Sequence, residues 1–368
     1  MTGSDMSITK PSYRTVVQRP NEHAIDHRTI VLQDSSLLLV SQRGARVYRP
    51  FRSEYDASEN WMPNAFNDPD QFSSLINSGH WNVGGERVWI GPEIQYMIPV
   101  RSDYWGSYHP PESMDPGVHT LEGDEQECVL TFRSALEGYN LGSGRVDLNI
   151  RITIAPAAHP LRFTRAYANG LQTVRFSGYT ERVELRWAGG AALLSESWNL
   201  AQVRPGGRVL IPATPLAEVT DYYEESSSLV GAISGAVSAE VTGDRRYKVG
   251  IKAQHVHGRA GYFRDQSEGE ASLLVRSFAN DPSSVYSEEP DFSADTLGDS
   301  MHVYNDDGGL GGFGEIEARG RTIGGSTGRQ ASVDEFTSWW FFGTPAKLDQ
   351  VAQHLLGVGL DITTTRES

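Results

Sequence analysis

Alternation between apolar and polar residues is the dominant pattern along the chain. The clearest example covers residues 146–154, where Val, Leu and Ile alternate strictly with Asp, Asn, Arg and Thr. A period of two is typical of a strand with one buried face, as in antiparallel sheets. Similar runs of β-branched and aromatic residues recur between clusters of Gly, Pro, Asp and Asn, and they predict further strands. We expect strands at residues 29–32, 36–42, 129–134, 146–154, 161–168, 173–179, 182–187, 208–211, 247–254, 271–278 and 337–342.

Helical patterns are few. Residues 68–77 form one short candidate, which Gly79 ends. Residues 345–356 form a second candidate with a single apolar face, and Gly357 follows as a C-cap. We expect this terminal helix to pack over a sheet through Leu348, Val351, Ala352, Leu355 and Leu356.

The chain shows no internal repeat, no Pro/Ser-rich linker and no break in composition, and strand runs continue on both sides of every loop. The pattern therefore predicts an all-β fold, a large antiparallel β-sandwich formed as one domain by residues 19–368. Residues 1–18 are polar and are expected to be loose. The loops at 54–81, 103–123 and 281–312 are long, and long loops on a rigid sheet are a usual place for a functional site.

Charge and cysteine content exclude several classes of protein. The 368 residues include one Cys, 32 Lys+Arg and 47 Asp+Glu, which gives a formal net charge of −15. A single Cys excludes an intramolecular disulfide framework and a Cys-cluster metal site, and the net acidity argues against nucleic acid as a partner. No stretch approaches the roughly 20 apolar residues of a membrane helix, and the first thirty residues have no apolar signal region. We therefore expect a cytoplasmic protein without a membrane partner.

A glycine-rich segment at residues 79–93 carries side chains suited to a saccharide. Two adjacent glycines let the backbone approach a ligand closely. Aromatic faces cover the C–H face of a pyranose, while guanidinium and carboxylate groups bind its hydroxyls. The alternative is a hairpin with a structural Arg–Glu pair. The candidate sugar contacts here are His80, Trp81, Arg87 and Glu93.

Two other regions add candidate contacts. Trp198 and Gln202 precede a tight Pro-Gly-Gly turn at residues 205–207, where they could face a cleft, although Trp198 could equally fill the core. His109 lies in the long loop at 103–123 and is a further candidate for substrate binding.

Residues 247–257 hold two histidines separated by one residue. If the strand continues to its end, His255 and His257 share a face and could bind a metal or provide a general acid. No third ligand is identifiable by spacing, so a divalent metal is a minor possibility and we expect no cofactor. The same alternation puts Lys248 on the opposite face or in solvent, and we include it as a candidate for binding substrate.

The segment at residues 304–319 combines a polar turn with alternating carboxylates. Asn-Asp-Asp-Gly at 305–308 resembles a fragment of a calcium loop but lacks the Glu that an EF-hand requires, which favours a simple turn. Glu315 and Glu317 alternate onto one face with Phe313. A carboxylate there is either on a solvated strand face or a buried general base. The chain has no Gly-x-Ser-x-Gly elbow, no P-loop and no His-Glu-x-x-His motif.

Taken together, these segments resemble the galactose mutarotase-like superfamily, which includes the aldose 1-epimerases, and in particular an uncharacterised bacterial branch of it. Residues 84–93 resemble the "GG-x-R-x-W-x-x-P-E" segment of that branch. The other matching segments are 198–207, 248–250, 304–306 and 313–317, so the resemblance spans roughly residues 30–357.

The resemblance implies a supersandwich whose concave face holds a sugar. It implies that a late-strand Glu is the general base at the anomeric hydroxyl, which maps onto Glu315 or Glu317, with Glu315 preferred. It also implies a His that protonates the ring oxygen. His255 and His257 lie in the corresponding region but in a different local motif, and His80 belongs to a loose echo of the epimerases' "Asn-x-x-x-His-Gly-Gly" stretch.

Three functions remain open. The first is a mutarotase or aldose-epimerase type of isomerase that uses acid–base catalysis and no cofactor. The second is a glycoside hydrolase or lyase on the same scaffold, with Glu93 and Glu315, or Glu315 and Glu335, as a carboxylate pair. The third is a sugar-binding protein without chemistry. In each case the expected partner is a small sugar, an oligosaccharide or a glycoside, and the oligomeric state is left open.

Overall fold

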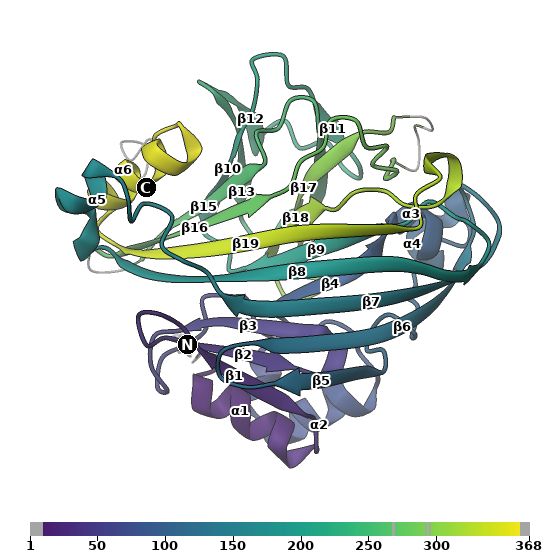
Figure 1. The fold of residues 1–368 in the computed structure, drawn as a ribbon, viewed down its shortest axis with the longest axis horizontal. Helices are drawn as coiled ribbons and strands as arrows, with labels where there is room; N and C mark the ends of the chain where they lie inside the picture. The colour runs from purple at the N-terminus through teal and green to yellow at the C-terminus, as the bar shows by residue number, and fades with distance from the viewer. Residues whose placement is uncertain (1–9, 267–268, 291–292, 294–295, 361–368) are drawn as a thin grey trace, which may run out of the picture.

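The computed structural model describes residues 10–266, 269–290, 293 and 296–360. Within these residues the chain forms two large antiparallel sheets (Figure 1), which confirms the predicted all-β sandwich. Sheet A has nine strands. In spatial order they are β1 (His27–Val31), β2 (Leu37–Ser41), β3 (Arg46–Phe51), β4 (Glu86–Gly91), β9 (Glu196–Val203), β18 (Gly314–Arg319), β17 (Asp299–Asn305), β14 (Tyr247–Lys252) and β11 (Val219–Asp221).

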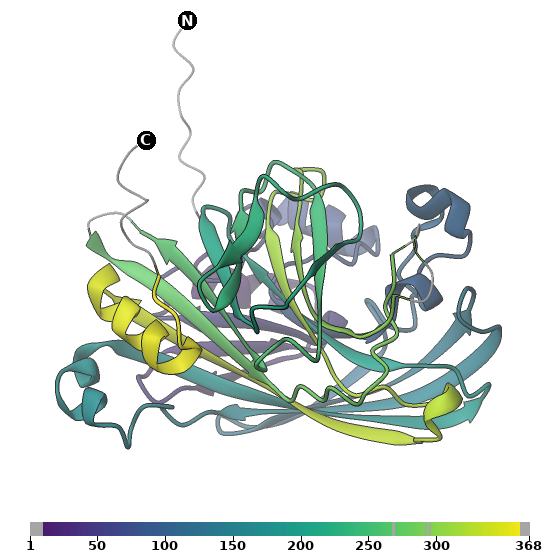
Figure 2. The same ribbon diagram turned by 90° about the horizontal axis from the view of Figure 1, so that it is seen from above.

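Sheet B has ten strands, and its long strands form a curved layer (Figure 2). In the predicted strand at 146–154 the apolar residues are buried, while the polar residues between them are exposed or half-buried. The main core lies between the sheets and joins residues such as Val88 and Ile316 of sheet A to Leu148 and Val183 of sheet B. The strands of sheet B are, in spatial order, β12 (Val230–Ile233), β13 (Ala236–Val241), β10 (Gly207–Pro212), β15 (Arg259–Asp265), β16 (Ala271–Phe278), β19 (Ala331–Gly343), β8 (Arg175–Gly190), β7 (Gly144–Pro156), β6 (Cys128–Gly138) and β5 (His119–Gly123).

Helices lie at the margins of the sandwich. Both predicted helices are present, as α2 (Pro69–Asn77) and α6 (Pro345–Leu356), and Gly357 ends α6 with a left-handed φ of 76°. The apolar face of α6 packs on β15, β16 and β19 at one end of sheet B (Figure 1). The shorter helices and 3-10 turns are α3 (Glu93–Tyr96), α4 (Tyr104–Ser107), α5 (Arg165–Ala168), η1 (Arg43–Ala45), η2 (Asn64–Asn67), η3 (Arg101–Asp103), η4 (Leu171–Thr173) and η6 (Gly325–Thr327).

The N-terminal region differs from the prediction of a loose segment over residues 1–18. Helix α1 (Tyr13–Glu22) begins within it, and Ser12 caps the helix by accepting a hydrogen bond from the backbone N–H of Thr15. Val16 is fully buried in a small cluster with β2, β3 and α2, so packing holds this helix in place. Residues 1–9 lie outside the described residues. No helix in the described part of the chain is long and apolar enough to cross a membrane.

Four of the predicted strand ranges were wrong in detail. Residues 161–168 form a turn followed by α5, because the Thr164 hydroxyl caps that helix at the backbone N–H of Tyr167. The runs at 173–179 and 182–187 belong to one strand, β8. Strand β14 ends at Lys252, where the N–H of His255 donates to the Lys252 carbonyl and turns the chain, so His255 and His257 do not share a strand face.

Candidate functional site

A pocket of about 380 Å³ lies on the face of sheet A that points away from sheet B. The central strands β4, β9, β18 and β14 form its floor, and loops after β4, β11 and β17 form its walls. Eight of its lining side chains are aromatic: Trp81, Trp89, Trp105, Tyr108, Trp198, Tyr223, Tyr304 and Phe313. Its charged lining residues are Arg87, Glu93, Arg246, Lys248, Asp306, Asp307, Glu315 and Glu317.

Strand register explains why two carboxylates meet here. Glu315 and Glu317 both line the pocket, while Ile316 between them is buried in the core between the sheets. Glu315 lies opposite Gln202 of β9 and Tyr304 of β17. Because directly opposed residues of antiparallel strands share a face, the centre of sheet A presents these side chains together.

Glu315 is held as an ion pair. Arg87 Nη1 donates to its Oε1 at 2.7 Å, and Gln202 Nε2 donates to the same oxygen at 3.0 Å. The Arg87 guanidinium also lies 4.0 Å from the centroid of the Trp89 ring. Both members of this pair are buried, and the contact between them is a charge-assisted hydrogen bond. The second oxygen, Oε2, accepts no hydrogen bond from the described residues.

Glu317 carries the second carboxyl group of β18 that lines the pocket, and it is fully buried. Burial, together with the negative charges of Glu315 and Glu93, raises the pKa of Glu317 to about 7, although the Lys248 ammonium opposes this rise. Its Oε2 accepts from Trp198 Nε1 at 3.0 Å and lies 3.6 Å from Lys248 Nζ. The carboxyl group is thus poised to gain or lose a proton near neutral pH.

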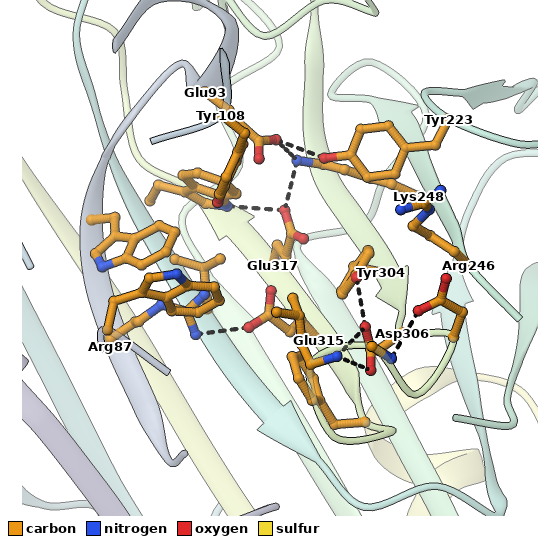
Figure 3. A pocket seen from close by; sticks show the side chains of 18 of the residues that line it. Arg87, Glu93, Tyr108, Tyr223, Arg246, Lys248, Tyr304, Asp306, Glu315 and Glu317 are labelled. Carbon is orange, nitrogen blue, oxygen red and sulfur yellow. Dashed lines mark hydrogen bonds and ion pairs between the residues drawn. The ribbon is translucent and has the colours of Figure 1, made fainter. Parts of the chain in front are cut away.

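Lys248 joins Glu317 to the opposite wall of the pocket (Figure 3). Its Nζ donates to Glu93 Oε2 at 2.6 Å, and the Tyr223 hydroxyl donates to the same oxygen at 3.0 Å. Burial disfavours the ammonium, but Glu317 and Glu93 outweigh this and raise the pKa of Lys248. Lys248 therefore remains charged in the pocket.

A second layer of contacts fixes Glu93. The backbone N–H groups of Glu93 and Ile94 donate to the Glu288 carboxylate at 2.6 and 3.2 Å. Glu288 in turn accepts from Arg319 of β18 at 2.5 Å. The start of α3 is thus tied to the strand that carries both central carboxylates, which limits the freedom of the pocket walls.

The predicted polar turn at residues 305–308 forms part of the rim. Asp306 accepts hydrogen bonds from the backbone N–H groups of Gly308, Leu310 and Gly312 at 3.0, 3.1 and 2.8 Å. It also accepts from the Tyr304 hydroxyl at 3.1 Å. The carboxylate therefore organises its own loop. Among the described residues no group of three or more His, Cys, Asp or Glu side chains is arranged to hold a metal ion.

The structure brings together most of the carboxylate, Arg, Lys and Trp candidates but none of the histidines. The candidates that line the pocket are Trp81, Arg87, Glu93, Trp198, Lys248, Glu315 and Glu317, and Gln202 contacts Glu315. No histidine of the described residues lines it. His80, His109 and His257 are exposed outside it, and His255 bonds the Thr214 hydroxyl at 2.8 Å in a turn. Glu335 is exposed on β19 of sheet B, so it does not pair with Glu315.

Several lining residues were not among the candidates chosen from the sequence. Trp105 and Tyr108 come from the loop at 103–123, from which only His109 had been chosen as a candidate. Arg246 lies two residues before Lys248, and Tyr304 lies two residues before Asp306 of the polar turn. The period of two in a strand could therefore have identified both residues. Tyr223 follows the short strand β11 and carried no signal of this kind.

Solved structures similar to this one come from several organisms. One is a galactose mutarotase-like protein from Lactobacillus casei, with 8% identity, 86% of this chain and 100% of that chain covered, and a TM-score of 0.44. Another is a putative aldose 1-epimerase from Klebsiella pneumoniae, with 9% identity, 89% and 82% covered, and a TM-score of 0.47. A third is an aldose epimerase homologue from C. elegans, with 8% identity, 87% and 99% covered, and a TM-score of 0.42.

These names include the superfamily that the sequence motifs resemble, and at such identities the likeness concerns the overall fold alone. No curated protein matches the chain in sequence. The model of a family of unknown function, DUF6786, matches residues 25–366, and the chain belongs to that family.

Proposed function

We propose that this protein is a carbohydrate-active enzyme of the aldose-epimerase type, which exchanges protons at the anomeric centre of a sugar. One observation carries the proposal. Two adjacent carboxyl groups, one ion-paired and one with its pKa raised to about 7, lie in the same aromatic pocket. An acid and a base with separated protonation behaviour are what ring opening of a sugar requires.

The lining of the pocket suits a saccharide. Large aromatic side chains cover the apolar C–H faces of a sugar ring, and a few placed polar groups fix its orientation. Here eight aromatic residues line the pocket, while Arg87, Lys248 and Glu93 supply donors and acceptors for hydroxyl groups. Burial also raises the pKa values of Tyr108 and Tyr223 well above the ordinary value for a phenol, so both hydroxyls stay neutral.

The two carboxyl groups divide the work. The Glu315 carboxylate removes the proton from the anomeric hydroxyl, while the Glu317 carboxyl delivers a proton to the ring oxygen. The bond from the anomeric carbon to the ring oxygen then breaks, and a carbonyl forms at that carbon. Rotation about the adjacent C–C bond and reversal of the two transfers give the other anomer. Each positioned proton transfer typically contributes about 10²–10⁴-fold.

This assignment departs from the resemblance in one respect. The epimerase pattern implies a histidine as the acid, and no histidine of the described residues lines this pocket. Glu317 takes that role because burial raises its pKa to about 7, which makes a protonated carboxyl group accessible near neutral pH. Trp198 and Lys248 hold the carboxyl group in place through its other oxygen.

Glycoside hydrolysis is the second candidate, and one arrangement favours it. Glu93 projects from a wall of the pocket and Glu317 from its floor. Glu93 Oε2 lies 2.6 Å and Glu317 Oε2 lies 3.6 Å from the same Lys248 nitrogen. The two carboxyl groups are therefore close enough to act as a glycosidase pair, for which the separation is roughly 5–9.5 Å. Lys248 occupies the space between them, which is why we place hydrolysis second.

Anomer exchange measured by NMR tests the proposal. Freshly dissolved α-glucose, α-galactose, α-mannose and α-xylose are followed with the wild type, Glu315→Gln, Glu317→Gln and the control Glu335→Gln. The control changes a glutamate that is exposed on sheet B. We expect faster exchange with the wild type and the control, and a loss of at least about 100-fold in each pocket variant.

Two outcomes would contradict the proposal. If the protein accelerates the anomer exchange of none of these sugars but releases product from a panel of aryl glycosides, the site is that of a glycoside hydrolase. Full activity in both pocket variants would remove the carboxyl pair from the mechanism.

A further inference from the structure

Two of the three cations that line the pocket are already neutralised inside it. Arg87 pairs with Glu315 at 2.7 Å, and Lys248 lies between Glu93 and Glu317. All of these side chains are buried. Both cations therefore have counter-charges within the pocket and need none from a ligand, and the Asp306 carboxylate is taken up by its own loop.

Arg246 differs from these two cations. Among the described residues it pairs with Glu224 Oε1 at 3.2 Å, and the Glu224 side chain is 60% exposed. Exposed pairs of this kind contribute little, about 0–1 kcal/mol, and solvent screens them. The Nη2 of Arg246 makes that contact, and the described residues place no hydrogen-bond partner on its Nη1, while the side chain is 31% exposed and lines the pocket. A guanidinium group with unused donors is thus available to a ligand.

An aromatic shelf holds Arg246 in position. Its guanidinium carbon lies 4.5 Å from the centroid of the Trp105 ring. Trp105 packs edge-on against Tyr223, with centroids 4.7 Å apart, yet 46% of Trp105 remains exposed. Stacking on an aromatic face fixes the plane of a guanidinium group and leaves its edge free for a planar or tetrahedral anion. Trp105 therefore positions the guanidinium group before a ligand binds.

The location of Arg246 relates it to the reacting end of the sugar. Arg246 precedes Lys248 by two residues and lies on the side of the pocket opposite Arg87 (Figure 3). Glu315 and Glu317 lie between these two sides. A sugar whose anomeric carbon contacts the carboxyl pair would therefore extend its far end towards Arg246.

We propose that the natural sugar carries an anionic group remote from its anomeric carbon, and that Arg246 binds this group. The inference rests on the proposed saccharide function and specifies its substrate class. Arg246 acts here as a specificity-determining residue and takes no part in proton transfer. A carboxylate or a phosphate on the sugar would accept hydrogen bonds from the same donors, and the experiment below distinguishes these two groups.

Calorimetric titration with matched sugars tests this proposal. Glucose, glucuronate and glucose 6-phosphate, with galactose, galacturonate and galactose 6-phosphate, are titrated into the wild type, Arg246→Gln and Arg14→Gln. Arg14 is a matched control because it also pairs with an exposed glutamate, Glu54, and stacks on an aromatic ring, Tyr55, but lies outside this pocket. We expect an anionic sugar to bind the wild type at least about tenfold more tightly than its neutral partner.

The variants separate the possible results. Arg246→Gln should abolish the preference and leave the affinity for the neutral sugar within about twofold, while Arg14→Gln should keep the preference. The anionic sugar whose affinity most exceeds that of its neutral partner shows whether the group that Arg246 binds is a carboxylate or a phosphate. Equal binding of neutral and anionic sugars by the wild type, or a preference that survives Arg246→Gln, would overturn the inference and leave the saccharide function standing. Binding of neither class would overturn both.

Discussion

The buried carboxyl group of Glu317 makes a prediction that does not require the substrate to be known. Its pKa is about 7 in the folded protein and has an ordinary value near 4.5. Between these two pH values the folded state binds more protons than the unfolded state, so the free energy of unfolding falls as the pH rises. At about 1.4 kcal/mol per pH unit, this group alone lowers the free energy of unfolding by about 3 kcal/mol between pH 4.5 and pH 8.

Glu317→Gln removes that dependence, because the amide keeps a similar shape and cannot ionise. The measurement is urea unfolding, followed by tryptophan fluorescence at pH 5 and pH 8. From the lower to the higher pH, the free energy of unfolding of the variant should rise by about 3 kcal/mol relative to that of the wild type. Glu335→Gln is the control, since that glutamate is exposed on β19 and should leave the pH dependence unchanged. If the wild type and Glu317→Gln lose stability equally between the two pH values, the reasoning about Glu317 is refuted.

Three further variants test other parts of the structure. Lys248→Met removes the ammonium that opposes the rise in the pKa of Glu317, so this pKa should rise further. In a pH–rate profile, the fall in activity caused by deprotonation of Glu317 should then move to higher pH. Arg87→Met leaves Glu315 buried without its counter-charge and should cost about 3–5 kcal/mol in the free energy of unfolding, measured with urea. Leu348→Ala opens a cavity under α6 and should cost about 2–5 kcal/mol while activity persists, because α6 packs on sheet B, away from the pocket.

Local pattern was sufficient where an element depends on its own residues. Helix α6 has one apolar face and a glycine at its end, and both signals lie within thirteen residues. Strand β7 alternates because one of its faces is buried and the other meets solvent. In contrast, β4 and β9 are buried on both faces, so they lack this alternation and were not predicted as strands. Helix α1 was missed because its residues are mostly polar and its stability comes from the contacts of Val16.

The same distinction applies to the candidate site. Glu315, Glu317 and Arg87 were found because they alternate along strands or follow a glycine pair. The pairing of Arg87 with Glu315 joins residues 228 positions apart, and no local pattern could specify it. The histidines were misplaced for a related reason, since the turn after Lys252 depends on one backbone hydrogen bond from His255.

Strand β18 has a consequence for how this protein can change during evolution. Glu315 and Glu317 face the pocket, while Ile316 and Ala318 face the core. A one-residue insertion within the strand would exchange the two sets, burying carboxylates among apolar side chains and emptying the pocket of its acids. Mutations that shift the register would therefore be removed by selection for folding before selection for activity could act. The rim loop held by Asp306 has no such constraint, so variation in ligand preference is expected to accumulate there.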